Sequence, residues 1–341
     1  MGPPARRGVR RAQIRAKYIP DVERFLDPLT YWPTQPPERY RGQLADAFQK
    51  SRAAAYSNIG LEDCTWYHTT ELPDGTVLEG QWDLRHHEKD YLGRVPLAGR
   101  SVLEFGPASG YLTFYMESQG AQVTAFEVGY DAAISMVPAV LEPDTGVEEA
   151  GLMEHTRRNV NAWWYLHRNR GSNAQLVHGD IYQLPDDLGQ YDIVLLGSIL
   201  LHCRDFARAL QQACARAKTT VVVVEPLRPD LDTGQRLVSF VPDVENLGAS
   251  VTWWGFSPGA ISAVLWRFGF AHTSVVRHTQ RYRSDGGDMR DVPYFTMVAQ
   301  RVSAGDEIRV PQLTAGRGKK TLQPQRLSAA AQALYARARR R

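Results

Sequence analysis

The stretch VLEFGPASGYL, residues 102–112, joins a short apolar run to a turn that contains two glycines. A dinucleotide-binding turn would read G-x-G-x-x-G after its strand, with glycines that let the backbone approach a pyrophosphate. Here only Gly106 and Gly110 are present, with Pro107 between them, and the acidic Glu104 precedes the turn. A carboxylate at this point repels phosphate but accepts hydrogen bonds from an ammonium group. The stretch therefore predicts a ligand site at a strand end that is not a phosphate cradle.

Strand and helix patterns alternate around this turn. Short apolar or β-branched runs predict strands at residues 101–105, 122–128, 174–180, 191–198 and 219–227. Helices are predicted at residues 110–120, 205–217 and 257–270, and a final hairpin at residues 273–278 and 294–301. Strands that are apolar throughout are typical of a parallel sheet covered on both faces. The chain is therefore predicted to be an α/β protein with a doubly wound, Rossmann-like sheet.

Acidic residues stand at the ends of the first three predicted strands. Glu127 follows Glu104 by 23 residues and is placed to accept hydrogen bonds from both hydroxyls of a ribose. Asp180 ends the third strand, where it can accept from an adenine amino group, and Ile181 can flank the ring. Open α/β sheets bind ligands at these strand ends. A ligand with a ribose, an adenine and a cationic amino acid fits all of these positions, so the sequence predicts a site for S-adenosylmethionine.

Charge is distributed unevenly along the 341 residues. The net charge is +3, but residues 1–17 carry six basic residues and residues 317–341 carry eight, in both cases without an acid. The body between these tails therefore carries −11. Basic tails can contact nucleic acid or anionic lipid, whereas an acidic body is a poor platform for a long polyanion. Solvated, flexible ends are the alternative interpretation of the tails.

Cysteine content and hydropathy bear on the compartment. Cys64, Cys203 and Cys214 are an odd number without metal-ligand spacing, which favours small buried residues in a reduced cytoplasm. The sequence has no run of about 18 apolar residues, and its N-terminus lacks the apolar segment of a secretory signal. A cytoplasmic protein without a membrane span is expected.

Composition divides the chain into four parts. Residues 1–40 form a basic, proline-rich arm, and residues 310–341 form a basic tail. Residues 41–98 form an extension, with a helix expected over 41–57 and strands on either side of a turn at residues 73–75. Residues 99–309 contain the sheet, and a long segment at 130–172 interrupts its alternation of strands and helices. We expect this segment to be a helical insertion.

Four longer stretches relate the chain to a known family. They are WYHTTELPDGTVLEGQWDLR (66–85), VLEFGPASGYLTFYMESQGAQVTAFE (102–127), GDIYQLPDDLGQYDIVLLGSILLH (179–202) and VTWWGFSPGAISAVLWRFGF (251–270). With them, the span from Trp66 to Arg301 resembles the class I S-adenosylmethionine-dependent methyltransferases, and in particular the tRNA wobble-uridine methyltransferase-like family. The resemblance implies a seven-stranded sheet with an antiparallel last strand. It also implies a donor site formed by Glu104, Gly106, Gly110, Glu127, Asp180, Ile181 and Ser198.

Two departures from that family bear on the donor and the acceptor. Wobble-uridine enzymes commonly have an aromatic residue where this chain has Leu201, and that residue helps to recognise a carboxylated donor. Leu201 cannot form a side-chain hydrogen bond, so ordinary S-adenosylmethionine is the expected donor. The segment at 130–172 is also long for the family. Together with the acidic body, these departures favour a small or medium-sized metabolite as the acceptor.

Candidate residues for the chemistry follow the fourth strand and flank the acceptor side. His202 is the candidate base, or the residue that orients the acceptor, with a structural histidine as the alternative. Aromatic and basic side chains are candidates for acceptor binding, through stacking, cation–π contact or an ion pair, with core packing or a solvated position as the alternative. They are Trp82 and Arg85, which with Asp83 precede the sheet, Trp163, Trp164, Trp253, Trp254, and Arg281 of a Gln280-Arg281 pair.

Other functions stay open at this point. A tRNA methyltransferase would use the basic tails as phosphate contacts. A non-catalytic S-adenosylmethionine-binding module would keep the site without turnover. An NAD-dependent oxidoreductase is disfavoured because the turn lacks a third glycine. No metal is expected, because His86, His87 and Glu88 have no further ligand in register, and the oligomeric state is not indicated by the sequence.

Overall fold

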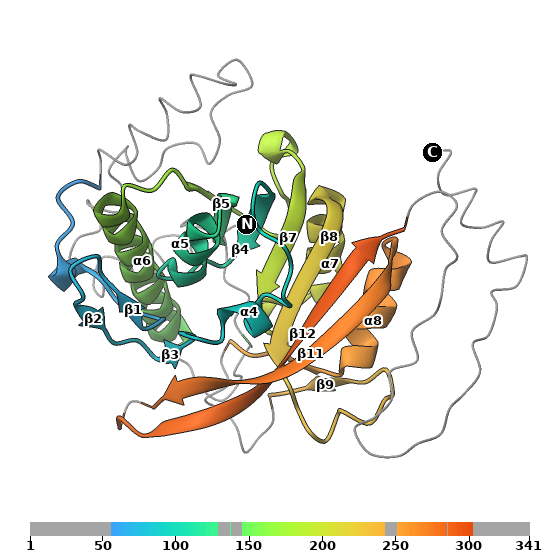
Figure 1. Ribbon diagram of the computed structural model, residues 1–341. Helices are drawn as coiled ribbons and strands as arrows, with labels where there is room; N and C mark the ends of the chain where they lie inside the picture. The colour runs from blue at the N-terminus through green and yellow to red at the C-terminus, as the bar shows by residue number, and fades with distance from the viewer. Residues whose placement is uncertain (1–55, 129–136, 138–144, 243–250, 285, 303–341) are drawn as a thin grey trace, which may run out of the picture.

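A sheet of eight strands organises the part of the chain that the structure describes, a computed structural model covering residues 56–128, 137, 145–242, 251–284 and 286–302 (Figure 1). In spatial order its strands are β3 (Trp82–Asp83), β11 (Phe270–Arg283), β12 (Met289–Arg301), β8 (Ala217–Pro226), β7 (Tyr191–Gly197), β4 (Ser101–Phe105), β5 (Gln122–Val128) and β6 (Gln175–Gly179). The five strands from β8 to β6 are parallel to one another. The predicted Rossmann-like α/β class is confirmed.

The sheet has one strand more than the seven that were expected. The last strand, β12, is antiparallel to both of its neighbours, as the resemblance implies. The additional strand is β3, which pairs with β11 at the edge of the sheet and places Trp82 opposite Tyr282. The segment before the predicted sheet domain therefore contributes a strand to it.

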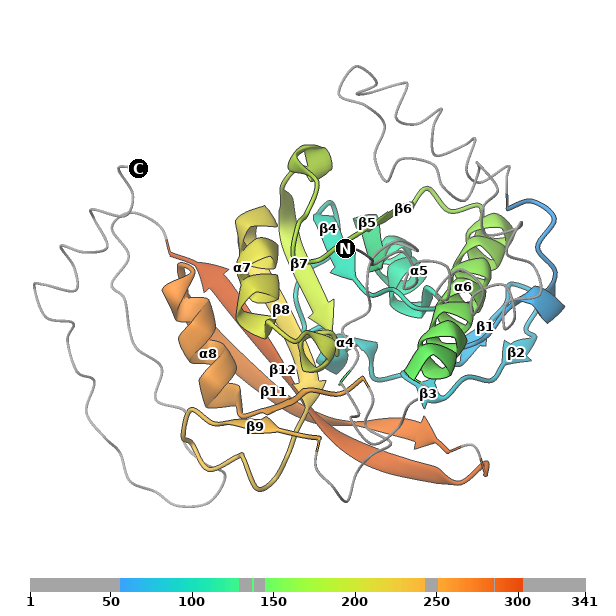
Figure 2. The same ribbon diagram turned by 180° about the vertical axis from the view of Figure 1, so that it is seen from behind.

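Helices cover both faces of this sheet (Figures 1 and 2). Helices α5 (Tyr111–Ser118) and α6 (Thr145–Arg170) pack on one face, and α7 (Phe206–Arg216) and α8 (Pro258–Arg267) pack on the other. In β8, Val222 and Val224 join the first core, whereas Val221 and Val223 join the second. Because successive side chains of a strand point to opposite faces, a strand covered on both sides must be apolar throughout.

Side-chain caps define the starts of the two helices on the second face. Asp205 precedes α7 and accepts a hydrogen bond from the backbone N–H of Arg208 at 3.0 Å. Ser257 precedes α8, and its hydroxyl accepts from the N–H of Ala260 at 3.1 Å, with Pro258 in the first turn. Such caps satisfy N–H groups that have no partner within the helix. The observed starts agree with the helices predicted from residues 205 and 257.

Helix α6 lies in the segment that was expected to be an insertion. It connects β5 to β6, which are parallel neighbours. Parallel strands cannot be joined by a tight turn and need a crossover, usually a helix. The described part of the segment 130–172 is therefore the crossover of this strand pair.

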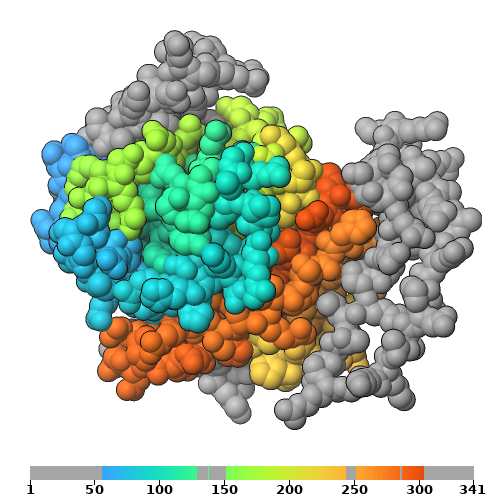
Figure 3. Space-filling model, in the orientation of Figure 1, coloured from blue at the N-terminus to red at the C-terminus, as the bar shows by residue number. Residues whose placement is uncertain are grey.

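Arginines of α6 hold the segment that precedes the sheet. Arg168 donates to the backbone carbonyls of Tyr56, Ser57 and Ile59 at 2.6–3.1 Å. Arg158 donates to the carbonyls of Glu62 and Cys64 and to the hydroxyl of Thr65. Figure 3 shows this segment, in blue, against the green helix. These hydrogen bonds hold residues 56–65 against α6, and the chain continues from there to the sheet.

Shorter elements complete the described part. They are the 3₁₀ turns η2 (Leu61–Asp63), η3 (Asp186–Leu188) and η4 (Leu200–His202), helix α4 (Glu88–Tyr91), and the antiparallel pairs β1 (Thr70–Glu71) with β2 (Val77–Leu78) and β9 (Val238–Phe240) with β10 (Trp254–Phe256). The strands expected around the turn at 73–75 are therefore present. Cys64, Cys203 and Cys214 are buried and unpaired.

Some expectations fall outside the described residues. They concern the arm at 1–40, the tail at 310–341 and all but the last two residues of the helix expected over 41–57. Within the described ranges, no helix combines the length and the apolar character needed to cross a membrane.

Candidate active site

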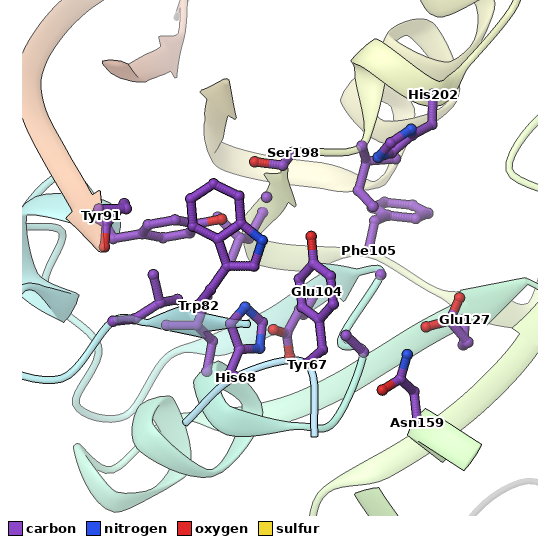
Figure 4. A pocket seen from close by; sticks show the side chains of 18 of the residues that line it. Tyr67, His68, Trp82, Tyr91, Glu104, Phe105, Glu127, Asn159, Ser198 and His202 are labelled. Carbon is purple, nitrogen blue, oxygen red and sulfur yellow. The ribbon is translucent and has the colours of Figure 1, made fainter. Parts of the chain in front are cut away.

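A cavity of about 210 Å³ lies at the carboxyl ends of β4, β5 and β7 (Figure 4). It is the strand-end position at which open α/β sheets bind ligands. The predicted site residues that line it are Glu104, Gly106, Glu127, Ser198, His202 and Trp82. The structure thus brings together residues from the first, second and fourth predicted strands and from the preceding extension.

The turn after β4 depends on its two glycines. Gly106 and Gly110 have φ angles of 68° and 88°, in the left-handed region that favours glycine. A Cβ at Gly106 would lie 2.2 Å from Ile199, and one at Gly110 would lie 2.6 Å from the rings of Phe114 and Trp163. Gly106 lines the cavity, whereas Gly110 starts α5. Both glycines predicted from the sequence are therefore required by the backbone, although only one faces the site.

Glu104 is the buried carboxylate at the end of β4, with 3% of its surface exposed. Its Oε2 accepts a hydrogen bond from the hydroxyl of Thr113, and that hydroxyl oxygen accepts from the indole N–H of Trp163 at 3.2 Å. Burial raises the pKa of Glu104 to about 7, and the nearby charge of Glu127 raises it as well. The hydrogen bond from Thr113 fixes the position of the carboxyl group, and its raised pKa means that it ionises near neutral pH.

Glu127 lies across the cavity from the Trp82 end, beside Asn159 of α6 (Figure 4). Its Oε1 accepts from the N–H of Val128 at 2.8 Å, and burial raises its pKa to about 7. Asn159 is buried, and within the described residues its Oδ1 has no hydrogen-bond partner. Two polar groups with free acceptor capacity therefore stand at this end of the cavity, as a ligand with hydroxyl groups requires.

Ser198 and His202 follow β7 on the other side of the cavity. Ser198 has a φ of 55°, unusual for a residue other than glycine, and its N–H donates to Val224 at 2.8 Å. The Nδ1 of His202 lies 2.8 Å from the carbonyl of Val251, so it carries the proton and leaves the lone pair on Nε2. In Figure 4 the ring lies beside Phe105, away from Trp82. His202 therefore lines the cavity with a free lone pair on Nε2, and its role as a base stays a prediction.

The predicted adenine contacts do not line the cavity. The Oδ1 of Asp180 accepts from the N–H of Tyr182 at 2.8 Å within its own turn. Ile181 is partly buried and packs against the second core. Their positions at the end of β6 agree with the sequence, but the described cavity ends before them, so their contact with an adenine stays a prediction.

The tryptophan pairs pack against other side chains, as the alternative interpretation of core packing expects, and a role as acceptor walls stays a prediction. Trp163 and Trp164 are 0% and 2% exposed and pack between α5 and the N-terminal segment, where Tyr56 stacks on Trp164 at 5.1 Å. Trp253 and Trp254 pack around η4, with the indole N–H of Trp254 donating to Cys203 at 3.0 Å. None of the four lines the cavity.

The predicted basic residues also lie outside the cavity lining. Arg85 forms an ion pair with Asp83 at 2.7 Å. Arg281 is exposed and stands opposite Asp83 in the β3–β11 register. Neither arginine lines the described cavity, so a contact of either one with an acceptor stays a prediction.

Most of the side chains at the Trp82 end were missed by the sequence analysis. They are Tyr67, His68, Tyr91 and Tyr294, which come from widely separated segments and converge only in the fold. Gln280 also lines this end; the sequence had drawn attention to it only as the neighbour of Arg281. Among the described residues that line the cavity, none is lysine or arginine. Burial lowers the pKa of His68 to about 3, so this histidine is neutral as well.

A family model described as a methyltransferase domain matches residues 81–275. No curated protein matches the sequence. Among solved structures, the chain is similar to the N-terminal domain of EvdMO1 with SAH bound, at 17% identity over 79% of this chain and 99% of that chain, with a TM-score of 0.43.

Two further solved structures are similar at comparable levels. One is the 1,6-didemethyltoxoflavin-N1-methyltransferase of Burkholderia thailandensis, at 16% identity over 64% of this chain and 78% of that chain, with a TM-score of 0.41. The other is the magnesium protoporphyrin IX methyltransferase of Synechocystis, at 15% identity over 63% and 76%, with a TM-score of 0.36. Likenesses this distant do not decide which molecule a protein acts on.

Proposed function

The chain belongs to the methyltransferase domain family, and on that premise we propose that it transfers the methyl group of S-adenosylmethionine to a small or medium-sized metabolite. The observation that carries the proposal is the pair Glu104 and Glu127, which end adjacent parallel strands and line one cavity. Two carboxylates side by side suit a ligand with hydroxyl and ammonium groups. They do not suit the pyrophosphate of a dinucleotide.

In this proposal, different residues of the cavity bind different parts of the donor. Glu127 accepts hydrogen bonds from ribose hydroxyls, and Asn159, whose Oδ1 has no partner among the described residues, stands beside it. Glu104, once ionised, pairs with the ammonium group of the methionine part. The absence of a Cβ at Gly106 lets the chain turn closely under Ile199. These residues fit ordinary S-adenosylmethionine, because no basic side chain of the described lining could hold the additional carboxylate of a carboxylated donor.

For this reaction the protein mainly has to position the donor's methyl group next to the acceptor. The donor brings a methyl group on a sulfonium, which moves to the acceptor's lone pair as the carbon–sulfur bond breaks and its electron pair stays on sulfur. The chain aligns the two molecules in the cavity at the strand ends. Where the acceptor loses a proton, the free Nε2 of His202 is the base that we propose. In a His202→Gln variant, kcat should then fall at pH 7 while the affinity for the donor is retained.

The acceptor class rests on charge. The cavity lining contains acids and neutral side chains, and the chain between the basic tails carries −11. A polyanion approaching this body meets repulsion, whereas an uncharged metabolite does not. The tRNA wobble-uridine enzyme is the alternative, and it requires the basic tails to overcome this repulsion.

Two measurements test the proposal with the full-length chain. Calorimetry should show binding of S-adenosylmethionine and S-adenosylhomocysteine and negligible binding of NAD; tighter binding of NAD would overturn the donor assignment. Methyl-labelled donor is then incubated with the protein and a cell extract, and the label is located after separation by size. Label in the small-molecule fraction supports a metabolite. Label in bulk tRNA that is lost as the salt concentration rises would replace it with the tRNA enzyme.

A further inference from the structure

We propose that the carbonyl oxygen of Gln280 selects an uncharged ring compound that presents an N–H or O–H group as the methyl acceptor. The inference rests on the proposed methyltransferase function and specifies the acceptor of the same site. It starts from Gln280 of β11, which lines the cavity, is fully buried, and has no partner for its Oε1 within the described residues.

A relay of hydrogen bonds fixes which end of the Gln280 amide faces away from its neighbours. The hydroxyl of Thr296 donates to the carbonyl of Tyr91 at 2.9 Å, so its oxygen must accept from the Nε2 of His278 at 2.9 Å. The remaining ring nitrogen, Nδ1, then carries the lone pair and accepts from the Nε2 of Gln280 at 2.7 Å.

The relay holds because His278 is neutral. Burial lowers its pKa to about 4, so at neutral pH the ring has one N–H and one lone pair. The amide of Gln280 cannot be turned round without placing its oxygen against that lone pair. The relay therefore leaves a carbonyl oxygen, which is an acceptor only, as the unsatisfied group. A buried carbonyl without a donor is costly, and a ligand that supplies the donor removes the cost.

Aromatic side chains line the cavity together with Gln280. Trp82 and Tyr294 meet edge to face with ring centroids 5.5 Å apart, and Tyr91 lies 6.4 Å from Tyr294. Tyr67 and His68 complete this end of the cavity (Figure 4). Aromatic walls favour a flat ring, which gains contact area and stacking or edge-to-face contacts.

The charges of the residues that line the cavity determine which ligand charge is favoured. The neighbouring acids disfavour a carboxylate or phosphate, and among the described lining residues no lysine or arginine could pair with one. His68 is neutral, and its Nδ1 has no partner within the described residues, so it offers a second neutral polar contact. An uncharged ring with at least one donor group meets every condition.

Matched pairs of small rings test the inference in the intact protein. Binding of phenol and anisole, and of 2-pyridone and N-methyl-2-pyridone, is measured by ligand-observed NMR with saturating S-adenosylhomocysteine, and benzoate serves as the anionic probe. The N–H or O–H compound of each pair should bind at least about tenfold more tightly than its methylated partner. Benzoate should bind more weakly than phenol.

Two variants locate the source of this preference. Gln280→Leu should abolish it while retaining the affinity for S-adenosylhomocysteine, whereas Thr279→Val, an exposed neighbour on the same strand, should preserve it. If Gln280→Leu does not fold, the inference is tested by the binding of the two pairs of compounds to the wild-type protein. Equal binding within both pairs, or tighter binding of benzoate, overturns this inference alone. Failure of the wild-type protein to bind S-adenosylhomocysteine overturns the proposed function and, with it, this inference.

Discussion

Glu104 and Glu127 end neighbouring strands and share one cavity, and burial raises the pKa of each to about 7. A protonated carboxyl group cannot pair with an ammonium and accepts hydrogen bonds less well than a carboxylate. Since the bound donor favours the ionised forms, donor affinity should rise as the pH rises through 7 and should level off above 8. Calorimetry between pH 6 and pH 8.5 measures this, and two buffers of different ionisation enthalpy should show protons released on binding. An affinity that does not vary over this range would mean that neither carboxyl group changes protonation with the donor.

The carboxylate of Glu127 is expected to bind the ribose of the donor. Glu127→Ala loses charged hydrogen bonds worth roughly 1.5–3 kcal/mol each, so the affinity for S-adenosylmethionine should fall about tenfold or more. The acceptor's KM should change much less. Asp186→Ala, an exposed acid outside the cavity, is the control and should leave donor affinity unchanged. Unaltered donor binding by folded Glu127→Ala would show that β5 does not end at the ribose.

The adjacent tryptophans of α6 allow a matched comparison. The indole N–H of Trp163 donates to Thr113, which holds Glu104, whereas that of Trp164 has no partner within the described residues. Trp163→Phe should therefore weaken donor binding by about two- to tenfold, and Trp164→Phe should leave it nearly unchanged. Donor affinities from calorimetry test this, with thermal melting as the check on folding. A rise in the acceptor's KM at constant donor affinity would instead support an acceptor contact for Trp163.

At the scale of elements, α6 connects the N-terminal segment to the site. Arg158 holds the carbonyls of Glu62 and Cys64, and a few residues later Tyr67 and His68 line the acceptor end. Arg158→Met, which keeps the apolar stem, should raise the acceptor's KM several-fold and lower amide-exchange protection around residues 62–68. The donor affinity should change little.

A neighbouring arginine is the control for that prediction. Arg157 forms an ion pair with Glu154 at 2.5 Å within the same helix. Arg157→Met should therefore preserve both the exchange protection and the KM. Equal effects of the two substitutions would show that a general loosening of α6, rather than the grip on the N-terminal segment, is responsible.

The elements differ in how far the sequence determines them. The β-branched run of β8 and the caps of α7 and α8 are local signals, so their positions were predicted closely. The acids at the ends of β4 and β5 were found because strand ends meet at one edge of a parallel sheet. The acceptor wall was missed because Tyr67, Tyr91 and Tyr294 meet only through tertiary contacts.

The burial of Trp163 and Trp164 illustrates the same limit. From the sequence, this pair could either wall an acceptor or pack in the core, because the pattern of one helix does not show what covers it. Here α5 and the N-terminal segment cover α6 from two sides, and Tyr56 stacks on Trp164. Only the three-dimensional arrangement shows that both rings belong to the core.

At the scale of the whole molecule, the acids buried near the cavity couple stability to pH. Besides Glu104 and Glu127, Glu225 at the end of β8 is 1% exposed, and burial raises its pKa to about 8. Its Oε1 accepts from the N–H of Leu200 at 2.9 Å, and its Oε2 has no partner within the described residues. The unfolded chain loses these protons near pH 4.5, whereas the folded protein retains them to pH 7 or 8.

This difference in proton binding fixes the sign of the pH dependence. Between pH 4.5 and 8 the folded state binds more protons than the unfolded state, so these groups make the free energy of unfolding fall as the pH rises. The contribution is on the order of 1 kcal/mol per pKa unit for each group. Glu225→Gln keeps a carbonyl oxygen for Leu200 and removes one charge. Denaturant unfolding without donor should show this variant more stable than wild type at pH 9 but not at pH 5. A constant difference across the range would mean that the pKa of Glu225 is the same in the folded and the unfolded chain, and the loss of stability would then have to come from the two glutamates of the cavity.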